Sequence, residues 1–246
     1  METAPPFRRT SGPHPLATTP PDPVCPLYPV EAETDGGHPV TGRVTANPTL
    51  AHYQAHAAHY ADLLADHDSA TARHRFLAQV GGTALRLLDL GCGGGRDLIG
   101  FRDAGAEVIG ADGSAALALI AAERTGCSVE VVDLLSTDPV PWEAAAFDGV
   151  WAHHLFFHLP SAALPFVLSR LHGWLRPGGV FYACDPVGDG LEGMAPDGRY
   201  LAFRRPQSWK AAVKAAGFCL IDEWRRPEGQ PRYQQNWLAT LWRVPT

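Results

Sequence analysis

The chain has 246 residues, of which 46% are hydrophobic and 19% are charged, which is typical of one globular domain. The formal net charge of −6 argues against nucleic acid as the main partner, because phosphate binding requires a concentrated basic face. No apolar run approaches the roughly 18 residues of a membrane-spanning helix, and the first residues lack the apolar segment of a secretory signal.

Cysteine usage indicates the compartment. Five cysteines occur far apart in the sequence and without CxxC spacing: Cys25, Cys92, Cys127, Cys184 and Cys219. Such a pattern favours reduced thiols over a disulfide framework or a zinc site. We therefore expect a cytoplasmic protein with no bound metal.

Two regions differ in composition. Residues 1–48 contain half of the 22 prolines and have almost no periodic apolar pattern, which predicts a disordered or loosely docked leader. Residues 49–246 form the predicted domain. Its first segment, 49–67, has apolar residues at helical spacing. It also contains three histidines, His52, His56 and His59, which we interpret as a polar helix face because no acid or cysteine completes a ligand set.

Beyond residue 85, strand-like and helix-like segments alternate. The predicted strands are 85–91, 107–114, 128–135, 147–154, 178–186, 219–226 and 234–244, and the predicted helices between them are 95–105, 114–126, 161–175 and 206–218. This alternation predicts an α/β fold with a doubly wound, Rossmann-like, seven-stranded and mostly parallel sheet that has helices on both faces. In such sheets the ligand binds outside the carboxyl ends of the strands.

A glycine-rich loop follows the first of these strands, in the sequence LLDLGCGGGRD at residues 87–97. Glycines there allow positive φ angles and let a ligand approach the backbone. The dinucleotide fingerprint GxGxxG would place glycine where Arg96 stands. An NAD-linked oxidoreductase is therefore the less favoured interpretation of this loop.

Three acids follow three successive strands. Asp89 precedes the first glycine and can accept hydrogen bonds from an ammonium group, whereas Asp112 can bind both hydroxyls of a ribose. Asp133 can accept from the amine of adenine while Leu134 packs against the ring. A ligand with an ammonium group, a ribose and adenine but no phosphate would use all three acids, and S-adenosylmethionine fits that description.

The motifs LLDLGCGGGRD, VIGADGS, VDLL, FDGVWAHHLFFHLP and WLRPGGVFYACDP occur in an order and spacing that resemble the class I S-adenosylmethionine-dependent methyltransferases. The likeness extends from about residue 50 to residue 244 and is strongest to bacterial small-molecule enzymes of the tellurite-resistance type. It implies cofactor roles for Asp89, Gly91, Gly93, Asp112 and Asp133. The expected cofactor-binding set also includes Tyr53, Tyr60, Cys92, Arg96, Gly113, Ser114, Leu134 and Ala152, the two tyrosines either covering the cofactor or packing in the core.

Histidines after the fourth strand are the candidate catalytic residues: His153, His154 and His158. A histidine that titrates near neutral pH can take a proton from an incoming nucleophile, so we expect activity to rise between about pH 6 and 7. For His158 a structural or cofactor-shaping role is the alternative. We expect one of His153 and His154 to line the acceptor site.

Late loops supply the candidate substrate-binding residues. The long segment 185–200 is either functional or a solvated, mobile loop, and the substrate-binding candidates are Asp185, Arg199, Tyr200 and Arg232. The sequence thus predicts a methyltransferase that uses S-adenosylmethionine to methylate a small-molecule N, O or S nucleophile, as a monomer or homodimer without nucleic acid or membrane partners. The alternative is a catalytically inactive accessory protein that binds S-adenosylmethionine or S-adenosylhomocysteine.

Overall fold

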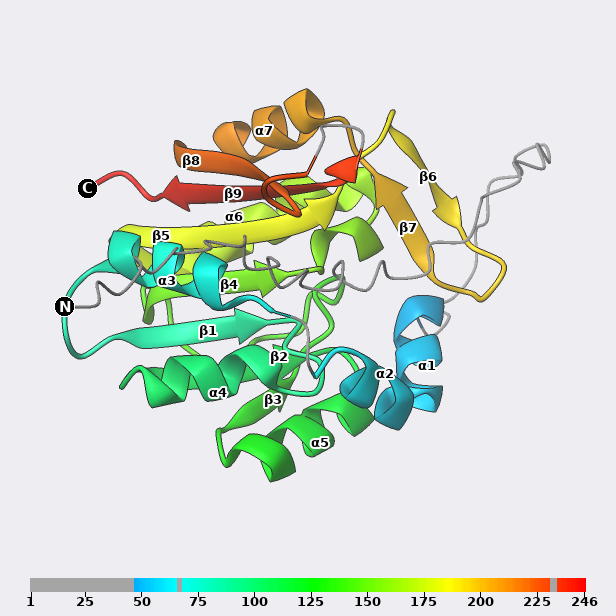
Figure 1. Cartoon of the computed structure of the whole chain (residues 1–246), viewed down its shortest axis with the longest axis horizontal. Helices are drawn as coiled ribbons and strands as arrows, with labels where there is room; N and C mark the ends of the chain where they lie inside the picture. The colour runs from blue at the N-terminus through cyan, green and yellow to red at the C-terminus, as the bar shows by residue number, and fades with distance from the viewer. Residues whose placement is uncertain (1–46, 66–67, 231–233) are drawn as a thin grey trace, which may run out of the picture.

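A computed structural model describes residues 47–65, 68–230 and 234–246, and Figure 1 shows the arrangement of their helices and strands. The helices are α1 (Pro48–Ala55), α2 (Ala57–Leu63), α3 (Ala70–Val80), α4 (Arg96–Asp103), α5 (Ala115–Thr125), α6 (Leu164–Trp174) and α7 (Pro206–Ala215), with two 3-10 turns, η1 (Phe156–His158) and η2 (Ser161–Ala163). The strands are β1 (Arg86–Leu90), β2 (Glu107–Asp112), β3 (Val129–Val131), β4 (Phe147–His153), β5 (Leu175–Pro186), β6 (Leu191–Met194), β7 (Tyr200–Phe203), β8 (Cys219–Arg226) and β9 (Trp237–Arg243).

Seven strands form one sheet in the order β3-β2-β1-β4-β5-β9-β8. The pairs among β3, β2, β1, β4 and β5 are parallel, whereas β9 pairs antiparallel with both β5 and β8. The order reverses at β1, since β2 lies on one side of it and β4 on the other. A ligand is therefore expected beyond the carboxyl ends of β1 and β4.

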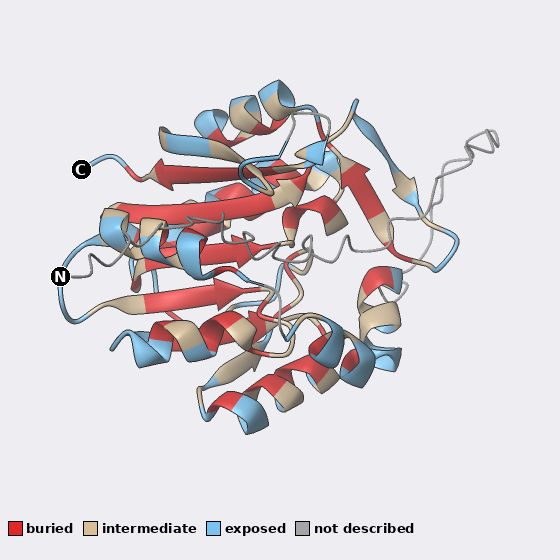
Figure 2. Ribbon diagram, viewed as in Figure 1, coloured by how far each residue is buried: buried red, intermediate tan, exposed pale blue. Residues whose placement is uncertain are grey.

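The sheet is buried on both faces, and its central strands are almost wholly buried (Figure 2). One hydrophobic cluster joins the sheet to α6 and α7 through residues such as Val167, Leu171 and Val213. A second cluster joins the opposite face to α3, α4 and α5 through residues such as Phe76 and Leu98. The predicted doubly wound α/β fold with helices on both faces is thereby confirmed.

Local chemistry explains where the helices begin and end. The Ser114 hydroxyl accepts from the backbone N–H of Leu117 at the start of α5, and Gly126 ends that helix with a positive φ of 69°. Pro165 fits the first turn of α6, where a missing N–H costs no hydrogen bond.

Three segments differ from the sequence predictions. The helix expected over 49–67 divides at His56 into α1 and α2, and α3 was not predicted. The segment 185–200, expected as a loop, contains β6 and leads into β7, with which β6 forms an antiparallel hairpin. The leader predicted for residues 1–48 falls almost entirely outside the described residues. Among the helices that the structure describes, none has the length and apolar character needed to traverse a bilayer.

Candidate cofactor and acceptor site

A cavity of about 1680 Å³ opens at the carboxyl ends of the central strands. Most of the predicted site residues line it: Tyr53, Tyr60, Asp89, Gly91, Cys92, Gly93, Arg96, Asp112, Gly113, Asp133, Leu134, His153, His154 and His158. Ser114, Ala152, Asp185, Arg199 and Tyr200 are absent from that lining. Arg232 lies outside the described residues.

The glycine loop takes a conformation that needs glycine at two positions facing the cavity. Gly91 and Gly93 have positive φ angles of 73° and 54°. A Cβ at Gly91 would approach the Leu155 side chain to 2.9 Å, whereas one at Gly93 would meet no atom within 4 Å. The open space at Gly93 lets a ligand lie directly against the backbone.

Asp89 is a buried acid without a complete set of partners. The residue is 2% exposed, and its Oδ2 atom has no hydrogen-bond partner among the described residues. Burial, together with the nearby negative charges of Asp97 and Asp112, raises its pKa well above the usual range. A ligand ammonium group would supply the missing donor and favour the ionised carboxylate.

Asp112 is the last residue of β2, and Asp133 lies just beyond the end of β3. Asp112 accepts from the backbone N–H of Gly93 at 3.0 Å and of Ser114 at 2.8 Å, although burial raises its pKa. Asp133 accepts from the backbone N–H of Leu135 at 2.9 Å, and the neighbouring Leu134 is buried. These contacts fix both carboxylates at the rim of the same cavity.

His153, at the end of β4, is enclosed by charged groups. Its Nδ1 lies 3.5 Å from Oδ2 of Asp97 and 3.2 Å from Nη2 of Arg96, and its Nε2 lies 2.8 Å from Nη1 of Arg226. A neutral ring with its proton on Nδ1 donates to Asp97 and accepts from Arg226. Burial lowers the pKa of His153 to about 3, with Arg96 and Arg226 acting in the same direction against Asp97. The expectation that this histidine titrates between pH 6 and 7 is therefore wrong.

Asp97 was missed by sequence reasoning, which assigned it no role within the glycine-loop motif. Its carboxylate is 4% exposed and accepts from Arg73 at 2.7 Å, from Arg96 at 2.6 Å and from the indole N–H of Trp151 at 3.1 Å, and also from the hydroxyl of Ser69. Burial alone would raise its pKa, but Arg96 and His153 hold it well below the usual range. An acid in the first turn of α4 beside Arg96 was the available sequence signal.

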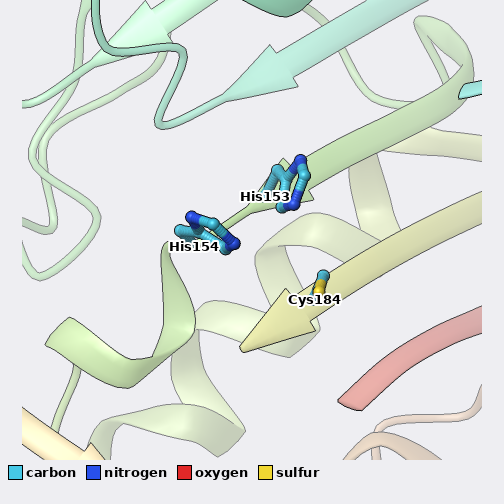
Figure 3. Close-up of side chains that lie close together, drawn as sticks. All are labelled: His153, His154 and Cys184. Carbon is cyan, nitrogen blue, oxygen red and sulfur yellow. The ribbon is translucent and has the colours of Figure 1, made fainter. Parts of the chain in front are cut away.

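His154 and Cys184 lie next to His153, as Figure 3 shows. One donor atom from each of the three residues lies within 4.8 Å of the others, a spacing that would suit a metal ion. However, the Arg226 guanidinium is bonded to His153 and its positive charge also acts on the Cys184 thiol. Burial nevertheless raises the pKa of that thiol to about 11. A metal cation would have to displace or oppose the guanidinium. Of the three residues, His153 and His154 line the cavity, whereas Cys184 is buried behind them.

His158 connects the cavity to the helix that covers it. Its Nδ1 is 3.0 Å from the carbonyl oxygen of Tyr200, and its Nε2 is 2.8 Å from the hydroxyl of Tyr53 on α1. Donation from Nδ1 leaves Nε2 to accept the tyrosine proton. Burial lowers the pKa of His158 to about 4, so this ring too is neutral near pH 7, again contrary to the expected titration.

Two of the residues predicted to bind substrate, Arg199 and Tyr200, contact α1 and α2, and their role toward a substrate stays a prediction. Tyr200 donates its backbone N–H to the Thr49 hydroxyl at 2.8 Å. Arg199 is buried, pairs with Asp197 at 2.6 Å and lies 5.9 Å from the ring centre of Tyr60. Asp185 accepts from the backbone N–H of Phe157 at 3.2 Å, and burial raises its pKa to about 7.

Known proteins resemble this chain in sequence and in fold. The family model described as "Methyltransferase domain" matches residues 87–179. An uncharacterized methyltransferase of Synechocystis is 33% identical over 100 residues, which cover 41% of this chain and 46% of that protein. The match thus spans less than half the length of that relative.

Solved structures share the fold across most of the chain. A 1,6-didemethyltoxoflavin-N1-methyltransferase of Burkholderia thailandensis, with 1,6-didemethyltoxoflavin and S-adenosylhomocysteine bound, superposes with a TM-score of 0.66 at 23% identity, covering 85% of this chain and 94% of the other. An S-adenosylmethionine-dependent methyltransferase of Mesorhizobium loti gives a TM-score of 0.58 at 21% identity, covering 70% and 96%. The chain therefore has the fold of these S-adenosylmethionine-dependent methyltransferases, and residues 87–179 match the methyltransferase family model.

S-adenosylmethionine, the cofactor of these methyltransferases, fits the set of hydrogen-bond acceptors described above. The partnerless oxygen of Asp89 suits its ammonium group, and the open backbone at Gly93 leaves room for its chain. Asp112 and Asp133 stand at strand ends where they can meet a ribose and an adenine amine. Each of these acids therefore has a matching group on the cofactor.

Proposed function

We propose that this protein transfers a methyl group from S-adenosylmethionine to a nitrogen, oxygen or sulfur atom of a small molecule. The observation that carries the proposal is the convergence of Asp89, Asp112 and Asp133 with the bare glycine loop on one cavity. The cavity volume of about 1680 Å³ exceeds the usual range for a single small ligand, so it can hold a cofactor together with an acceptor. The Burkholderia methyltransferase, whose structure has 1,6-didemethyltoxoflavin and S-adenosylhomocysteine bound, supports a small molecule as the acceptor.

When bound, the cofactor supplies an activated methyl group on a sulfonium ion. Asp89 would hold the ammonium group, Asp112 the ribose hydroxyls, and Asp133 with Leu134 the adenine. The protein then contributes mainly alignment and exclusion of water, because Tyr53 and Tyr60 on α1 and α2 line the same cavity. His153 and His158, neutral at pH 7, orient neighbouring groups through the hydrogen bonds described above.

Two measurements test this proposal. Calorimetry should detect binding of S-adenosylhomocysteine without an acceptor, and Asp89→Asn should weaken it, whereas the exposed control Asp222→Asn on β8 should not. Label from methyl-labelled S-adenosylmethionine should then appear on a member of a panel of thiols, phenols, amines and acids. Failure to bind S-adenosylhomocysteine would refute the proposal. Binding without transfer to any acceptor would favour the inactive accessory protein.

We also propose that the protein acts in the cytoplasm, as a monomer or homodimer. The four cysteines within the described residues are free thiols, which suits a reducing compartment. Size-exclusion chromatography with light scattering would test the oligomeric state, and fractionation of cells that produce the protein would test its location.

A further inference from the structure

Two tyrosine rings lie against each other in the helices that line one side of the cavity. Tyr53 is on α1 and Tyr60 is on α2, and their ring centres are 4.7 Å apart with an angle of 57° between the ring planes. Both residues line the cavity, and both are half-buried. The pair is therefore not enclosed in the core, and it presents aromatic surface to a ligand.

Each tyrosine hydroxyl contacts a histidine in the same way. The hydroxyl of Tyr53 lies 2.8 Å from Nε2 of His158, as described above. The hydroxyl of Tyr60 lies 3.0 Å from Nε2 of His52, whose Nδ1 is 2.9 Å from the carbonyl oxygen of Asp197. Because Nδ1 of each histidine donates to a backbone carbonyl, Nε2 accepts the tyrosine proton. These hydrogen bonds fix the positions of both rings.

The two helices rest on the loops that we assign to the cofactor. A Cβ at Gly113, in the loop after β2, would clash with the side chain of Leu50 on α1. A Cβ at Gly94, in the glycine loop after β1, would lie 2.7 Å from the Cβ of Ala61 on α2. Leu50 precedes the first tyrosine by one helical turn, and Ala61 directly follows the second. Both rings are therefore near these two loops.

Tyr53 extends from the cofactor side of the cavity to the end of β4. Its helix rests on the loop after β2, and its hydroxyl contacts His158 in η1, which follows β4. The sulfur of S-adenosylmethionine connects the amino-acid chain, assigned to Asp89 and the glycine loop, with the ribose, assigned to Asp112. The sulfur would therefore lie between these two acids, with the tyrosine pair on the opposite side of the cavity.

One cation lies close to the two tyrosines, but it is paired. The guanidinium carbon of Arg199 is 5.9 Å from the ring centre of Tyr60, and Arg199 pairs with Asp197 at 2.6 Å. Although burial opposes the change, hydrogen bonds to Asp197 and Tyr53 raise the pKa of Arg199. Arg199 is not among the described residues that line the cavity. Its charge is therefore balanced by Asp197 and lies outside the space that a ligand would occupy.

We propose that Tyr53 and Tyr60 bind the positive charge of the sulfonium of S-adenosylmethionine through the faces of their rings. This inference rests on the proposed function, and it names the residues that distinguish the cofactor from its product. Methyl transfer converts the sulfonium into the neutral thioether of S-adenosylhomocysteine. An aromatic face attracts a cation through the quadrupole of the ring, most strongly where water is excluded. The tyrosine pair therefore adds to the affinity for the cofactor and not to that for the product.

Equilibrium binding without an acceptor tests the inference. Calorimetry gives the dissociation constant of S-adenosylhomocysteine divided by that of S-adenosylmethionine, which we call the charge ratio. Tyr53→Leu and Tyr60→Leu should each lower the charge ratio at least about threefold, the change expected when a cation loses an aromatic face. Tyr53→Phe keeps the ring and loses the hydrogen bond to His158, so it should preserve the ratio. Sinefungin, in which a carbon bearing an ammonium group replaces the sulfonium, should lose affinity in the leucine variants as S-adenosylmethionine does.

The design separates the rings from other contributions. Charged groups that also line the cavity, such as Asp89, Arg73 and Arg96, are the same in the unaltered protein and in every tyrosine variant, so their effect on the charge ratio cancels. Leu134→Ala is the control for a general loss of affinity. It removes packing expected against the adenine, which both ligands share, and should leave the charge ratio unchanged. Thermal unfolding shows whether each variant is folded.

An unchanged charge ratio in both leucine variants, with the affinity for both ligands lowered equally, would overturn the inference and leave the tyrosines a packing role. Where a leucine variant does not fold, protein in which difluorotyrosine replaces all six tyrosines provides the second measurement. Fluorine makes the ring less attractive to a cation, so the charge ratio should fall, and an unchanged ratio would again overturn the inference.

The proposed function can fail separately. If both ligands bind the unaltered protein and the charge ratio does not respond to the tyrosines, the methyltransferase function survives and the sulfonium assignment alone is refuted. If the unaltered protein binds neither S-adenosylmethionine nor S-adenosylhomocysteine, the proposed function fails, and this inference fails with it.

Discussion

Replacing His158 should change how the stability of the protein depends on pH. In the folded protein the ring is enclosed by Tyr53, Tyr200 and the chain around η1, and burial lowers its pKa to about 4. In the unfolded chain the pKa is about 6.5. Near pH 7 both states are largely neutral at this residue. Below about pH 6.5 the unfolded chain binds a proton at this histidine, whereas the folded protein does not bind one until about pH 4. The free energy of unfolding therefore decreases as the pH falls.

The size of the effect follows from these two pKa values. The number of protons bound at this residue by the unfolded state minus that bound by the folded state, integrated from pH 7 to pH 5, is about 1.4. Multiplied by 2.303RT, this lowers the unfolding free energy by about 2 kcal/mol. Asp185, whose pKa is raised to about 7, works in the opposite direction because the folded state binds its proton more readily. The total pH dependence of the protein therefore mixes opposing contributions. A variant comparison isolates that of His158.

Urea unfolding of the unaltered protein and of His158→Gln, at pH 7 and at pH 5 and constant ionic strength, measures that contribution. The unaltered protein should lose about 2 kcal/mol more between the two pH values than the variant does. His59→Gln, at an exposed position of α2, is the control, since it removes a histidine without touching the buried network. An identical pH dependence in the unaltered protein and His158→Gln would refute the reasoning.

Three further predictions concern the site. Asp112→Ala should weaken S-adenosylhomocysteine binding by about 1–3 kcal/mol in calorimetry, and unchanged affinity in the folded variant would contradict the cofactor assignment. Asp97→Asn should lower the free energy of unfolding by about 3–5 kcal/mol in urea, because it leaves Arg73 and Arg96 without their shared buried charge; a loss below about 1 kcal/mol would show that the network is dispensable. Methyl transfer should be unchanged after treatment with EDTA, because the Arg226 guanidinium already places a positive charge beside His153 and Cys184. A loss of activity that Zn²⁺ restores would show that the cluster of His153, His154 and Cys184 binds a metal.

The fold was largely predictable from the sequence because its signals are local. Apolar runs of strand length, separated by helical segments with glycine at their ends, predict a parallel doubly wound sheet whatever the surrounding structure. The hairpin of β6 and β7 was missed because its four-residue strands carry a weak pattern, and β6 is mostly exposed. The break at His56 was also missed, since the apolar spacing continues across it.

The positions of the three strand-end acids were predictable for the same reason. In a parallel sheet, residues that end neighbouring strands must lie at one edge, so Asp89, Asp112 and Asp133 are brought together by topology alone. The residue types and the strand order were enough to predict that these three acids lie near one another. No side-chain orientation had to be known in advance.

The state of the histidines was decided by tertiary structure. The sequence shows three histidines after a strand, but a pKa depends on what surrounds the ring. For His153 that environment includes Arg96 on α4 and Arg226 on β8, which are 57 and 73 residues away from it in the sequence. The sequence by itself thus determined the sheet and the acids at its edge, whereas only the folded chain placed Arg73, Arg96 and Arg226 around one cavity, because contacts between distant elements leave no local pattern to read.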